Sequence, residues 1–443
     1  MKRSESFPER MSRLFYNVEH RPHGVNSYHS KTITFQVTED CNLRCVYCYQ
    51  GAKTKRRMTF ETAKAIIDML LASDERSCKY ITSNKLSGVA FDFIGGEPFL
   101  EVGLIDRIMD YFVEQAFLLE HPLAYRYMIS ISSNGTLYFL PEVQRFIEKW
   151  HRHLSLSISV DGNKALHDAC RVFPDGSGSY DIAIAAAKDY MARFGEIGSK
   201  MTISPGNVQY LAEAVLELVE NGYREIYLNC VYEDGWTTDH AKTLYNQLRA
   251  LADELVMMQD PPTLSIFHPF IGRPMDASDN QNWCGGTGCM LAFDADGLSY
   301  PCLRYMATSL NGAQDPYVIG DLEHGIMNQP EHIARVELLE GITRRSQSTD
   351  ECWNCPIASG CSWCSAYNYQ VYGTPDKRAT FICVMHKARV LANVYYWNLR
   401  RRMDAAVDPF PLNVPREWAV PIIGEAEYEA LKTIAEVNCN GSC

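Results

Sequence analysis

Short apolar runs alternate with longer amphipathic segments along the chain between residues 31 and 260. The apolar runs predict strands at 32–37, 89–94, 127–131, 154–160, 200–203 and 225–228. The segments between them repeat apolar residues at helical spacing and predict helices at 60–71, 102–119, 141–150, 180–194, 208–220 and 239–258. Repeated strand–helix units are typical of parallel strands joined by right-handed crossovers. The pattern therefore predicts an α/β fold, a partial (β/α)6 TIM barrel whose chemistry lies at the carboxyl ends of the strands.

The first predicted helix, at 60–71, illustrates the pattern. Thr59 is suited to be its N-cap, and Glu61 in the first turn complements the helix dipole. A full capping box is absent because Thr62 stands where Glu or Gln would complete it. The residues expected on the buried face are Ala63, Ile66, Ile67 and Leu70.

The alternating pattern breaks at Asp260-Pro261-Pro262. Residues 265–383 are rich in cysteine and in turn-forming glycine, and metal binding is expected to drive their folding because they lack the apolar mass of a conventional core. A helix is predicted at 386–401, followed by a Pro-rich tail from Pro409. The sequence thus divides into an N-terminal extension (1–30), a barrel (31–260), a cysteine-rich domain (261–390) and a C-terminal helix with a tail (391–443).

The composition is that of a globular protein, with 46% hydrophobic and 22% charged residues. A net charge of −12 argues against nucleic-acid binding, because neutralising phosphates needs a basic surface. No apolar run is long enough to span a bilayer, and the N-terminal residues do not resemble a signal peptide. A cytoplasmic location is therefore expected. Thiols stay reduced there, so clusters among the 16 cysteines indicate metal sites rather than disulfides.

Three cysteines, Cys41, Cys45 and Cys48, follow the first predicted strand within eight residues. Thiols this close together are not expected to be core residues. They leave a four-iron cluster one ligand short, so the open iron can bind a small chelating molecule. A zinc site is the alternative, although a structural zinc site is closed by a fourth ligand.

The spacing Cys-x3-Cys-x-Tyr-Cys after the first strand of a six-unit barrel resembles the radical S-adenosylmethionine (SAM) superfamily. The resemblance implies that Cys41, Cys45 and Cys48 hold a [4Fe–4S] cluster, whose unligated iron chelates the amino and carboxylate groups of SAM. Electron transfer then cleaves SAM to methionine and a 5′-deoxyadenosyl radical, which abstracts a hydrogen atom from the substrate.

Segments after the next three strands extend the resemblance. Gly95-Gly96-Glu97-Pro98 is similar to the motif that binds the SAM amino group, and an ordinary strand-to-helix turn is its alternative. Ser133-Asn134-Gly135-Thr136 and the residues 157–162 resemble segments that contact the SAM ribose and carboxylate. Arg171 is expected to pair with that carboxylate, although these polar residues also suit surface loops, and Tyr47 suits either adenine contact or packing. The SAM contacts implied by the resemblance are Tyr47, Gly95, Gly96, Glu97, Pro98, Ser133, Asn134, Ser159 and Arg171.

A second cysteine constellation, between residues 284 and 383, resembles the SPASM extension, which holds two auxiliary [4Fe–4S] clusters. The resemblance assigns one cluster to Cys284, Cys289, Cys302 and Cys364, and the other to Cys352, Cys355, Cys361 and Cys383. The chain departs from the family where two residues rather than three separate Cys361 from Cys364, which puts the assignment of Cys364 in doubt. Two zinc knuckles are the alternative. Together with the barrel cluster, the resemblance implies three [4Fe–4S] clusters.

Five cysteines remain outside these constellations. Cys78, Cys170 and Cys230 are interpreted as small buried hydrophobic residues. Cys439 and Cys443 are either a mobile thiol pair near the active site or part of a disordered chain end, and we favour the latter.

The family resemblance narrows the reaction. Anaerobic sulfatase-maturing enzymes carry an aspartate base directly after the cysteine of a Tyr-Pro-Cys segment, where this chain has Leu303 after Cys302. Leucine cannot accept a proton, so formylglycine formation is not expected. Most other members mature ribosomally made peptides (RiPPs). The aromatic residues between 353 and 372 resemble those of maturases for cysteine-rich precursors, with packing around the clusters as the alternative.

The sequence therefore predicts a radical SAM peptide maturase that forms an intramolecular thioether in a cysteine-containing precursor peptide. Carbon–carbon crosslinking, oxidative decarboxylation and a non-catalytic zinc-binding scaffold are the alternatives. The resemblance also implies an electron donor of the flavodoxin or ferredoxin type. Residues 1–30 are too few for a whole leader-binding winged helix, so leader recognition is expected on the barrel, in reduced form or on a separate protein.

Overall fold

The computed structural model describes residues 30–51, 53–72, 80–81, 86–195, 197–232, 235–282 and 284–440, with the backbone alone for 437–440. The extension predicted at 1–30, except for Ser30, lies outside the described residues. The same is true of Cys78, Cys443 and the side chain of Cys439.

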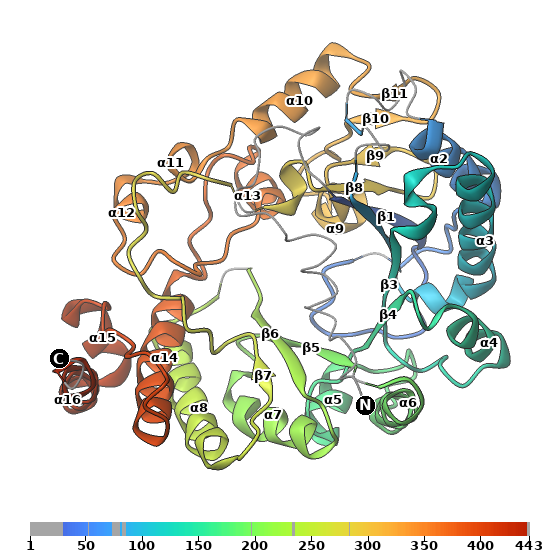
Figure 1. Cartoon of the computed structure of the whole chain (residues 1–443). Coiled ribbons are helices and arrows are strands. Elements are labelled where there is room, and N and C mark those ends of the chain that lie inside the picture. Colours follow the sequence, from blue (N-terminus) through green and yellow to red (C-terminus); the bar gives the residue numbers. More distant parts are fainter. Residues whose placement is uncertain are drawn as a thin grey trace.

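A single curved sheet organises the fold, with the strand order β11-β10-β9-β8-β1-β2-β3-β4-β5-β6-β7 (Figure 1). From β1 to β7 every neighbouring pair is parallel. The parallel strands are β1 (Ser30–Thr38), β2 (Gly88–Gly95), β3 (Tyr127–Ser133), β4 (Leu154–Ile158), β5 (Gly198–Ile203), β6 (Glu225–Cys230) and β7 (Thr263–Leu264). On the other side of β1 the sheet continues through β8 (Met290–Phe293), β9 (Ser299–Tyr300), β10 (Gly320–Asp321) and β11 (Gly325–Ile326). β8 pairs parallel with β1, whereas β9 to β11 are antiparallel.

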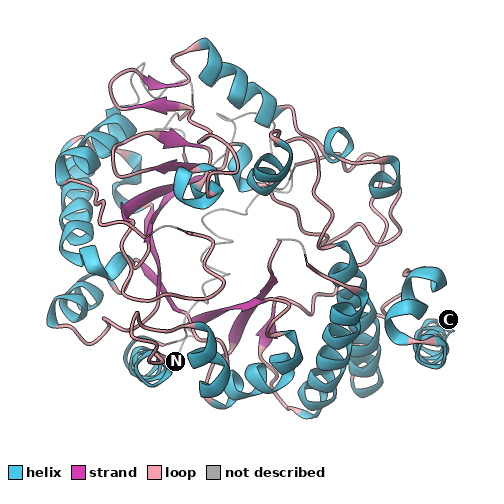
Figure 2. Ribbon diagram, turned by 180° about the vertical axis from the view of Figure 1, so that it is seen from behind, coloured by secondary structure: helices cyan, strands magenta, loops and turns pink. Residues whose placement is uncertain are grey.

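Helices lie on the outside of this curved sheet (Figure 2). Those of the barrel are α2 (Phe60–Ala72), α3 (Val102–Leu118), α4 (Pro141–Trp150), α5 (Lys164–Cys170), α6 (Tyr180–Phe194), α7 (Leu211–Glu220) and α8 (Thr238–Met257). The cysteine-rich region adds α9 (Ala307–Leu310), α10 (Pro330–Glu340), α11 (Arg344–Gln347), α12 (Asp350–Trp353) and α13 (Ser365–Tyr372). The chain ends with α14 (Cys383–Met403), α15 (Arg416–Ile423) and α16 (Glu425–Asn440).

The two faces of the parallel strands differ in polarity. Phe91 of β2 packs against Phe112 of α3, with ring centroids 4.5 Å apart, so this face is the one that the helices cover. Successive side chains of a strand point to opposite faces, so Asp92 faces the inside of the barrel. Strand register aligns Asp92 with Thr34 of β1 and Ser130 of β3. The outer face is therefore apolar and the inner face polar.

Most predicted barrel elements are present within two or three residues of their expected bounds. The helix predicted at 208–220 begins as a 3-10 turn, η5 (Val208–Tyr210), before α7. Thr59 accepts a hydrogen bond from the Thr62 N–H at 3.0 Å, as expected of an N-cap. The prediction omitted α5, and it also omitted every strand after β6.

The prediction of a Pro-rich tail was wrong. Residues 416–440 form α15 and α16, and Glu427 of α16 accepts hydrogen bonds from Tyr245 and Arg249 of α8 at 2.5 and 2.8 Å. The domain boundary proposed at 390 falls inside α14. Within the described residues, no helix is both long enough and apolar enough to cross a membrane.

Candidate functional site

Cys41, Cys45 and Cys48, here called the barrel trio, lie in the loop that leaves the carboxyl end of β1. Two backbone hydrogen bonds hold this loop, from Arg44 N to the Val172 carbonyl at 2.7 Å and from Val46 N to the Cys170 carbonyl at 2.9 Å. The loop is thereby fixed to the segment at the end of α5, which brings the first and fourth strand–helix units together.

The thiols of the barrel trio influence one another. Burial raises the pKa of the Cys41 thiol to about 11, and the neighbouring Cys45 raises it further. Burial also raises the pKa of Cys45, with Cys48 adding to the shift and Arg171 opposing it. Lys53 donates a hydrogen bond to the Cys48 sulfur at 3.0 Å. The raised pKa values of Cys41 and Cys45 disfavour their thiolates, and a bound cationic metal centre would stabilise those thiolates.

Two glycines bring the end of β2 against the loop that carries the barrel trio, here called the trio loop. The Gly96 N–H donates to the Thr38 carbonyl at 3.2 Å, and the Glu97 N–H donates to the Asp40 carbonyl at 2.9 Å. A Cβ atom on Gly96 would lie 2.2 Å from the Asp40 carbonyl oxygen and 2.6 Å from the Cys41 Cβ. A Cβ atom on Gly95 would lie 2.2 Å from the Thr38 carbonyl oxygen. Only glycine permits this approach, so the motif fits the trio loop sterically.

Glu97 is buried beside the trio loop, directly before Pro98, which begins the 3-10 turn η3 (Pro98–Glu101). Its Oε1 accepts hydrogen bonds from Phe99 N at 3.1 Å and Ser133 Oγ at 2.8 Å. Its Oε2 accepts from Asn134 N at 2.8 Å. Burial raises the pKa of Glu97 to about 7, although these hydrogen bonds oppose the shift. Oε2 has one donor among the described residues and two lone pairs, so it can accept a further donor.

Ser133 and Asn134 are therefore hydrogen-bond donors to the Glu97 carboxylate. The Asn134 side chain also donates to Asn42 Oδ1 at 2.8 Å, which ties the end of β3 to the trio loop. Ser159 lies beside them, and its N–H donates to the Ser133 carbonyl at 2.9 Å. The structure thus brings the predicted SAM-contact residues of β2, β3 and β4 to one edge of the sheet, and their contact with SAM stays a prediction.

Arg171 has a partner that sequence reasoning missed. Its Nε and Nη2 atoms donate to the fully buried Asp161 carboxylate at 2.8 and 3.2 Å. Tyr47 donates from its hydroxyl to the same carboxylate. This arrangement pairs the Arg171 charge with that of Asp161 and fixes the hydroxyl of Tyr47, which lies between Cys45 and Cys48 in the sequence. The polar segment at the end of the fourth strand, which contains Asp161, was the available signal.

Replacing Asp161 with asparagine is expected to destabilise the fold by about 3–5 kcal/mol, because a buried Arg171 would lose its counter-charge. Urea unfolding of protein purified without oxygen, with its metal content matched between variants, measures this change. The matched control is Asp181→Asn, whose ion pair with Lys164 is exposed, and little change is expected. An equal loss of stability in the two variants would contradict the prediction.

Cys284, Cys302 and Cys364, the first C-terminal group, lie close together. Burial raises the pKa of the Cys302 thiol strongly, and Cys364 and Cys284 are the next largest causes. The Cys284 sulfur lies 3.1 Å from the hydroxyl oxygen of Ser365, the residue after Cys364. Cys289, which the resemblance assigns to the same cluster, precedes β8, and its thiol interacts with buried Lys31. Its role as a ligand stays a prediction.

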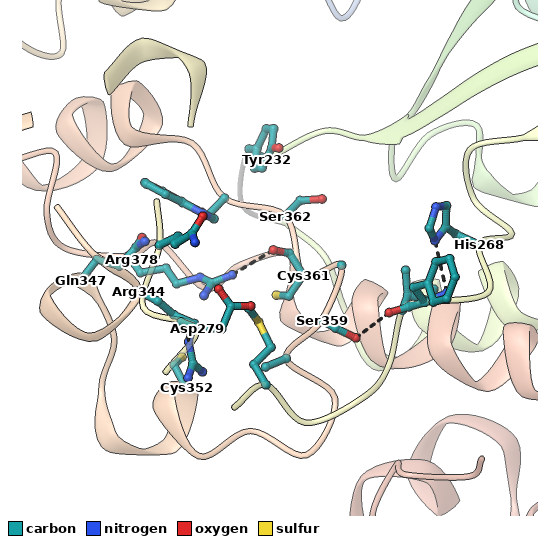
Figure 3. Close-up of a pocket in the computed structure, with 17 residues that line it drawn as sticks. Tyr232, His268, Asp279, Arg344, Gln347, Cys352, Ser359, Cys361, Ser362 and Arg378 are labelled. Atoms are coloured by element: carbon teal, nitrogen blue, oxygen red, sulfur yellow. Dashed lines mark hydrogen bonds between the residues drawn. The ribbon is translucent and has the colours of Figure 1, made fainter. Parts of the chain in front are cut away.

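The second C-terminal group comprises Cys352, Cys355, Cys361 and Cys383. Burial raises the pKa of Cys361 to about 11, and the other three cysteines of the group contribute to the shift while Arg378 opposes it. A cavity of about 650 Å³ borders Cys352 and Cys361 (Figure 3). Arg378 donates to the Cys361 carbonyl at 3.1 Å at its edge. The first C-terminal group thus joins segments about 80 residues apart, whereas the second comes from residues 352–383.

The donor chemistry of the three groups fits iron–sulfur clusters. A tetrahedral zinc site needs its thiolates on one ion, about 2.3 Å from it. A cubane cluster binds each thiolate to a different iron, so it accepts sulfur atoms that lie further apart than the ligands of one ion.

No protein-family model matches the chain. An uncharacterized protein of Methanocaldococcus jannaschii is 29% identical over 199 residues, which cover 44% of this chain and 61% of that protein. The chain thus spans less than two thirds of this relative. The mycofactocin maturase MftC of Mycolicibacterium smegmatis is 25% identical over 345 residues, covering 74% of this chain and 76% of the relative. The radical SAM cyclopropyl synthase TigE of Paramaledivibacter caminithermalis is 23% identical over 220 residues, which cover 46% of this chain and 42% of TigE.

Solved structures share the architecture. Native anSMEcpe with bound AdoMet superposes with a TM-score of 0.61 at 15% identity, covering 85% of this chain and all of that one. Streptococcus suis SuiB bound to its precursor peptide SuiA gives a TM-score of 0.52 at 13% identity, covering 80% of this chain and 76% of SuiB. At these identities the likeness establishes the fold. The prediction of a partial barrel followed by a cysteine-rich domain is thereby confirmed.

Proposed function

We propose that this chain, which is homologous to radical SAM enzymes, modifies a ribosomally made precursor peptide and closes a thioether crosslink in it. The observation that carries the proposal is the packing of the barrel trio against Gly95, Gly96 and Glu97. Three thiols and one buried carboxylate lie together at the carboxyl edge of the sheet, where barrel enzymes carry out their chemistry.

In this proposal Cys41, Cys45 and Cys48 hold a [4Fe–4S] cluster with one open iron, and SAM binds there. When both are bound, the cluster and SAM would supply a carbon-centred radical that removes a hydrogen atom from the substrate. Glu97 accepts a hydrogen bond from the SAM ammonium group through Oε2. Ser133 and Asn134 hold the Glu97 carboxylate in place, and Asp161 orients Arg171 and Tyr47.

The C-terminal cysteines support peptide crosslinking. Cys284, Cys289, Cys302 and Cys364 would hold one auxiliary cluster, and Cys352, Cys355, Cys361 and Cys383 would hold the other. Eight thiolates close both clusters, which suits the uptake of the electron released when a substrate radical bonds to sulfur. Leu303 follows Cys302 without a base, which argues against formylglycine formation. A flavodoxin or ferredoxin is the expected electron donor.

Peptides are the proposed substrate class because SuiB was solved with its precursor peptide and anSMEcpe with the Cp18Cys peptide. The second candidate function is a modification of the peptide that forms a bond other than a thioether. The similarity to the cyclopropyl synthase TigE favours carbon–carbon bond formation over sulfatase maturation. A zinc-loaded scaffold is the non-enzymatic alternative.

Metal analysis tests the enzymatic proposal. Protein purified without oxygen is expected to contain about twelve iron atoms and as many sulfides, the content of three cubane clusters. It should also release 5′-deoxyadenosine from SAM when dithionite is added. Zinc without iron would contradict the proposal.

The thioether is tested separately, with a cysteine-containing precursor peptide co-expressed with the enzyme. Mass spectrometry is expected to show the loss of two hydrogens per crosslink. The crosslinked cysteine should no longer react with iodoacetamide. Loss of two hydrogens from a peptide whose cysteines all remain alkylatable would favour a carbon–carbon bond.

A further inference from the structure

The inner face of the barrel carries polar side chains where barrels of this kind are usually filled by branched apolar residues. Asp92 aligns with Thr34 on one side and Ser130 on the other, and Ser130 aligns with Ser155 of β4. These positions alternate with buried apolar residues that face the helices. The interior is therefore built to receive a polar ligand.

Lys200 of β5 is the charged group that stands out in this interior. Ser157, on the inner face of β4, pairs with Gly198 of β5, so Lys200 two residues further on also points into the barrel. Its side chain is accessible to solvent there. Among the described residues, its ammonium group has neither a hydrogen bond nor an ion pair, and its electrostatic neighbours are Asp92, Arg171 and Arg304.

The carboxylate that interacts electrostatically with Lys200, that of Asp92, has other partners. Asp92 accepts hydrogen bonds from Thr34, at 3.3 Å, and from Ser130, and burial raises its pKa. Asp161 belongs to Arg171. Among the described residues, no carboxylate therefore contacts the Lys200 ammonium group directly.

Arg304 places this charge in the space between two cysteine groups. Its guanidinium carbon lies 5.3 Å from the centre of the Tyr49 ring. Tyr49 directly follows Cys48 of the barrel trio, and Arg304 lies two residues after Cys302 of the first C-terminal group. Lys200 interacts with Arg304, so two cations from separate segments face the region where a substrate would lie between those groups.

We propose that Lys200, with Arg304 beside it, binds a carboxylate of the peptide substrate inside the barrel. This inference rests on the proposed function, because it names the chemistry by which the same site selects its substrate. The carboxylate is either an acidic side chain or the peptide C-terminus. Arg171 does not take this role because Asp161 already neutralises it.

Affinity selection with a peptide library tests the proposal. Random nonapeptides, synthesised once with a free and once with an amidated C-terminus, are incubated with the iron-loaded protein and SAM, and mass spectrometry identifies the retained peptides. We expect retained peptides to carry Asp or Glu in the amidated library, or to come mainly from the free-acid library. These two outcomes distinguish an acidic side chain from a C-terminal carboxylate.

Lys200→Met is expected to reduce this carboxylate preference about tenfold, the loss of one charge-assisted hydrogen bond. Lys200→Arg should retain the preference, and Lys200→Glu should shift retention toward Lys- and Arg-containing peptides. The matched control is Lys188→Met, on the exposed surface of α6, which should retain the wild-type preference. Iron content and unfolding temperature confirm that each variant is folded.

The proposal is overturned if wild-type protein shows no carboxylate preference or if Lys200→Met and Lys200→Glu retain it. It is also overturned if Lys200→Met weakens the equilibrium binding of SAM and leaves peptide selection unchanged, because the carboxylate would then be that of SAM. Failure of the proposed function is distinct from these results. It would appear as wild-type protein that lacks iron or does not cleave SAM.

Discussion

Cys45→Ala is expected to abolish reductive cleavage of SAM, with the yield of 5′-deoxyadenosine falling by more than about 100-fold. Changes to residues that merely surround a metal site already cost about 10–100-fold, and Cys45 is proposed to bind the metal itself. Iron content should fall from about twelve to about eight atoms per chain, because the two C-terminal groups do not include Cys45. Anaerobic incubation with SAM and dithionite, followed by chromatography, measures the product.

The fold is expected to survive this substitution. The trio loop is held by backbone hydrogen bonds of Arg44 and Val46, which do not depend on the Cys45 side chain. Cys170→Ala is the matched control, since Cys170 is buried next to the same loop and contributes its carbonyl, not its sulfur, to the bond with Val46. This control should keep its iron and its activity. A Cys45→Ala protein that still yields 5′-deoxyadenosine would show that the cluster assignment is wrong.

The barrel was predictable because local patterns encode it. A strand that is apolar on one face and polar on the other reads as an alternation, and α4 and α6 start and end where their periodicity does. β8 was not predictable in this way. Its four residues carry no alternation, and they join the sheet only because the cysteine-rich region folds back beside β1.

The C-terminal helices were not predicted because their segment contains several prolines. Pro421 lies inside α15, and Pro415 directly precedes it, so the segment reads as a tail. Packing against α8 overrides this local preference, with Tyr245 and Arg249 bonded to Glu427 of α16. Such contacts join residues about 180 positions apart, and no local window contains both partners.

The residues of the candidate site were likewise predictable only in part. The barrel trio and the C-terminal cysteines could be predicted because the ligand spacing within each segment is local. The residues that contact those segments could not be predicted, because tertiary structure brings them together. Asp161 is the ion-pair partner of Arg171, and Lys200 becomes notable only when strand direction places it inside the barrel.

Gly96→Ala is expected to disable the site as fully as the loss of a cysteine, although the substitution removes no ligand. The added Cβ would meet the Asp40 carbonyl oxygen at 2.2 Å and the Cys41 Cβ at 2.6 Å. Real Cβ contacts are not this short, and both neighbours belong to the trio loop, so either the loop or the end of β2 must move. The expected results are weaker iron binding by the barrel trio, loss of the change that SAM produces in its electron paramagnetic resonance spectrum, and SAM cleavage reduced more than about 100-fold.

Gly103→Ala provides the control, because a Cβ at Gly103 in the first turn of α3 would meet nothing within 4 Å. That variant should be as active as the wild type and more stable by about 0.5–1 kcal/mol, the usual gain of alanine over glycine in a helix. Wild-type SAM cleavage by Gly96→Ala would contradict the steric argument. It would mean that the trio loop can withdraw from β2 without losing its cluster, so that close packing of the two segments is incidental to the chemistry.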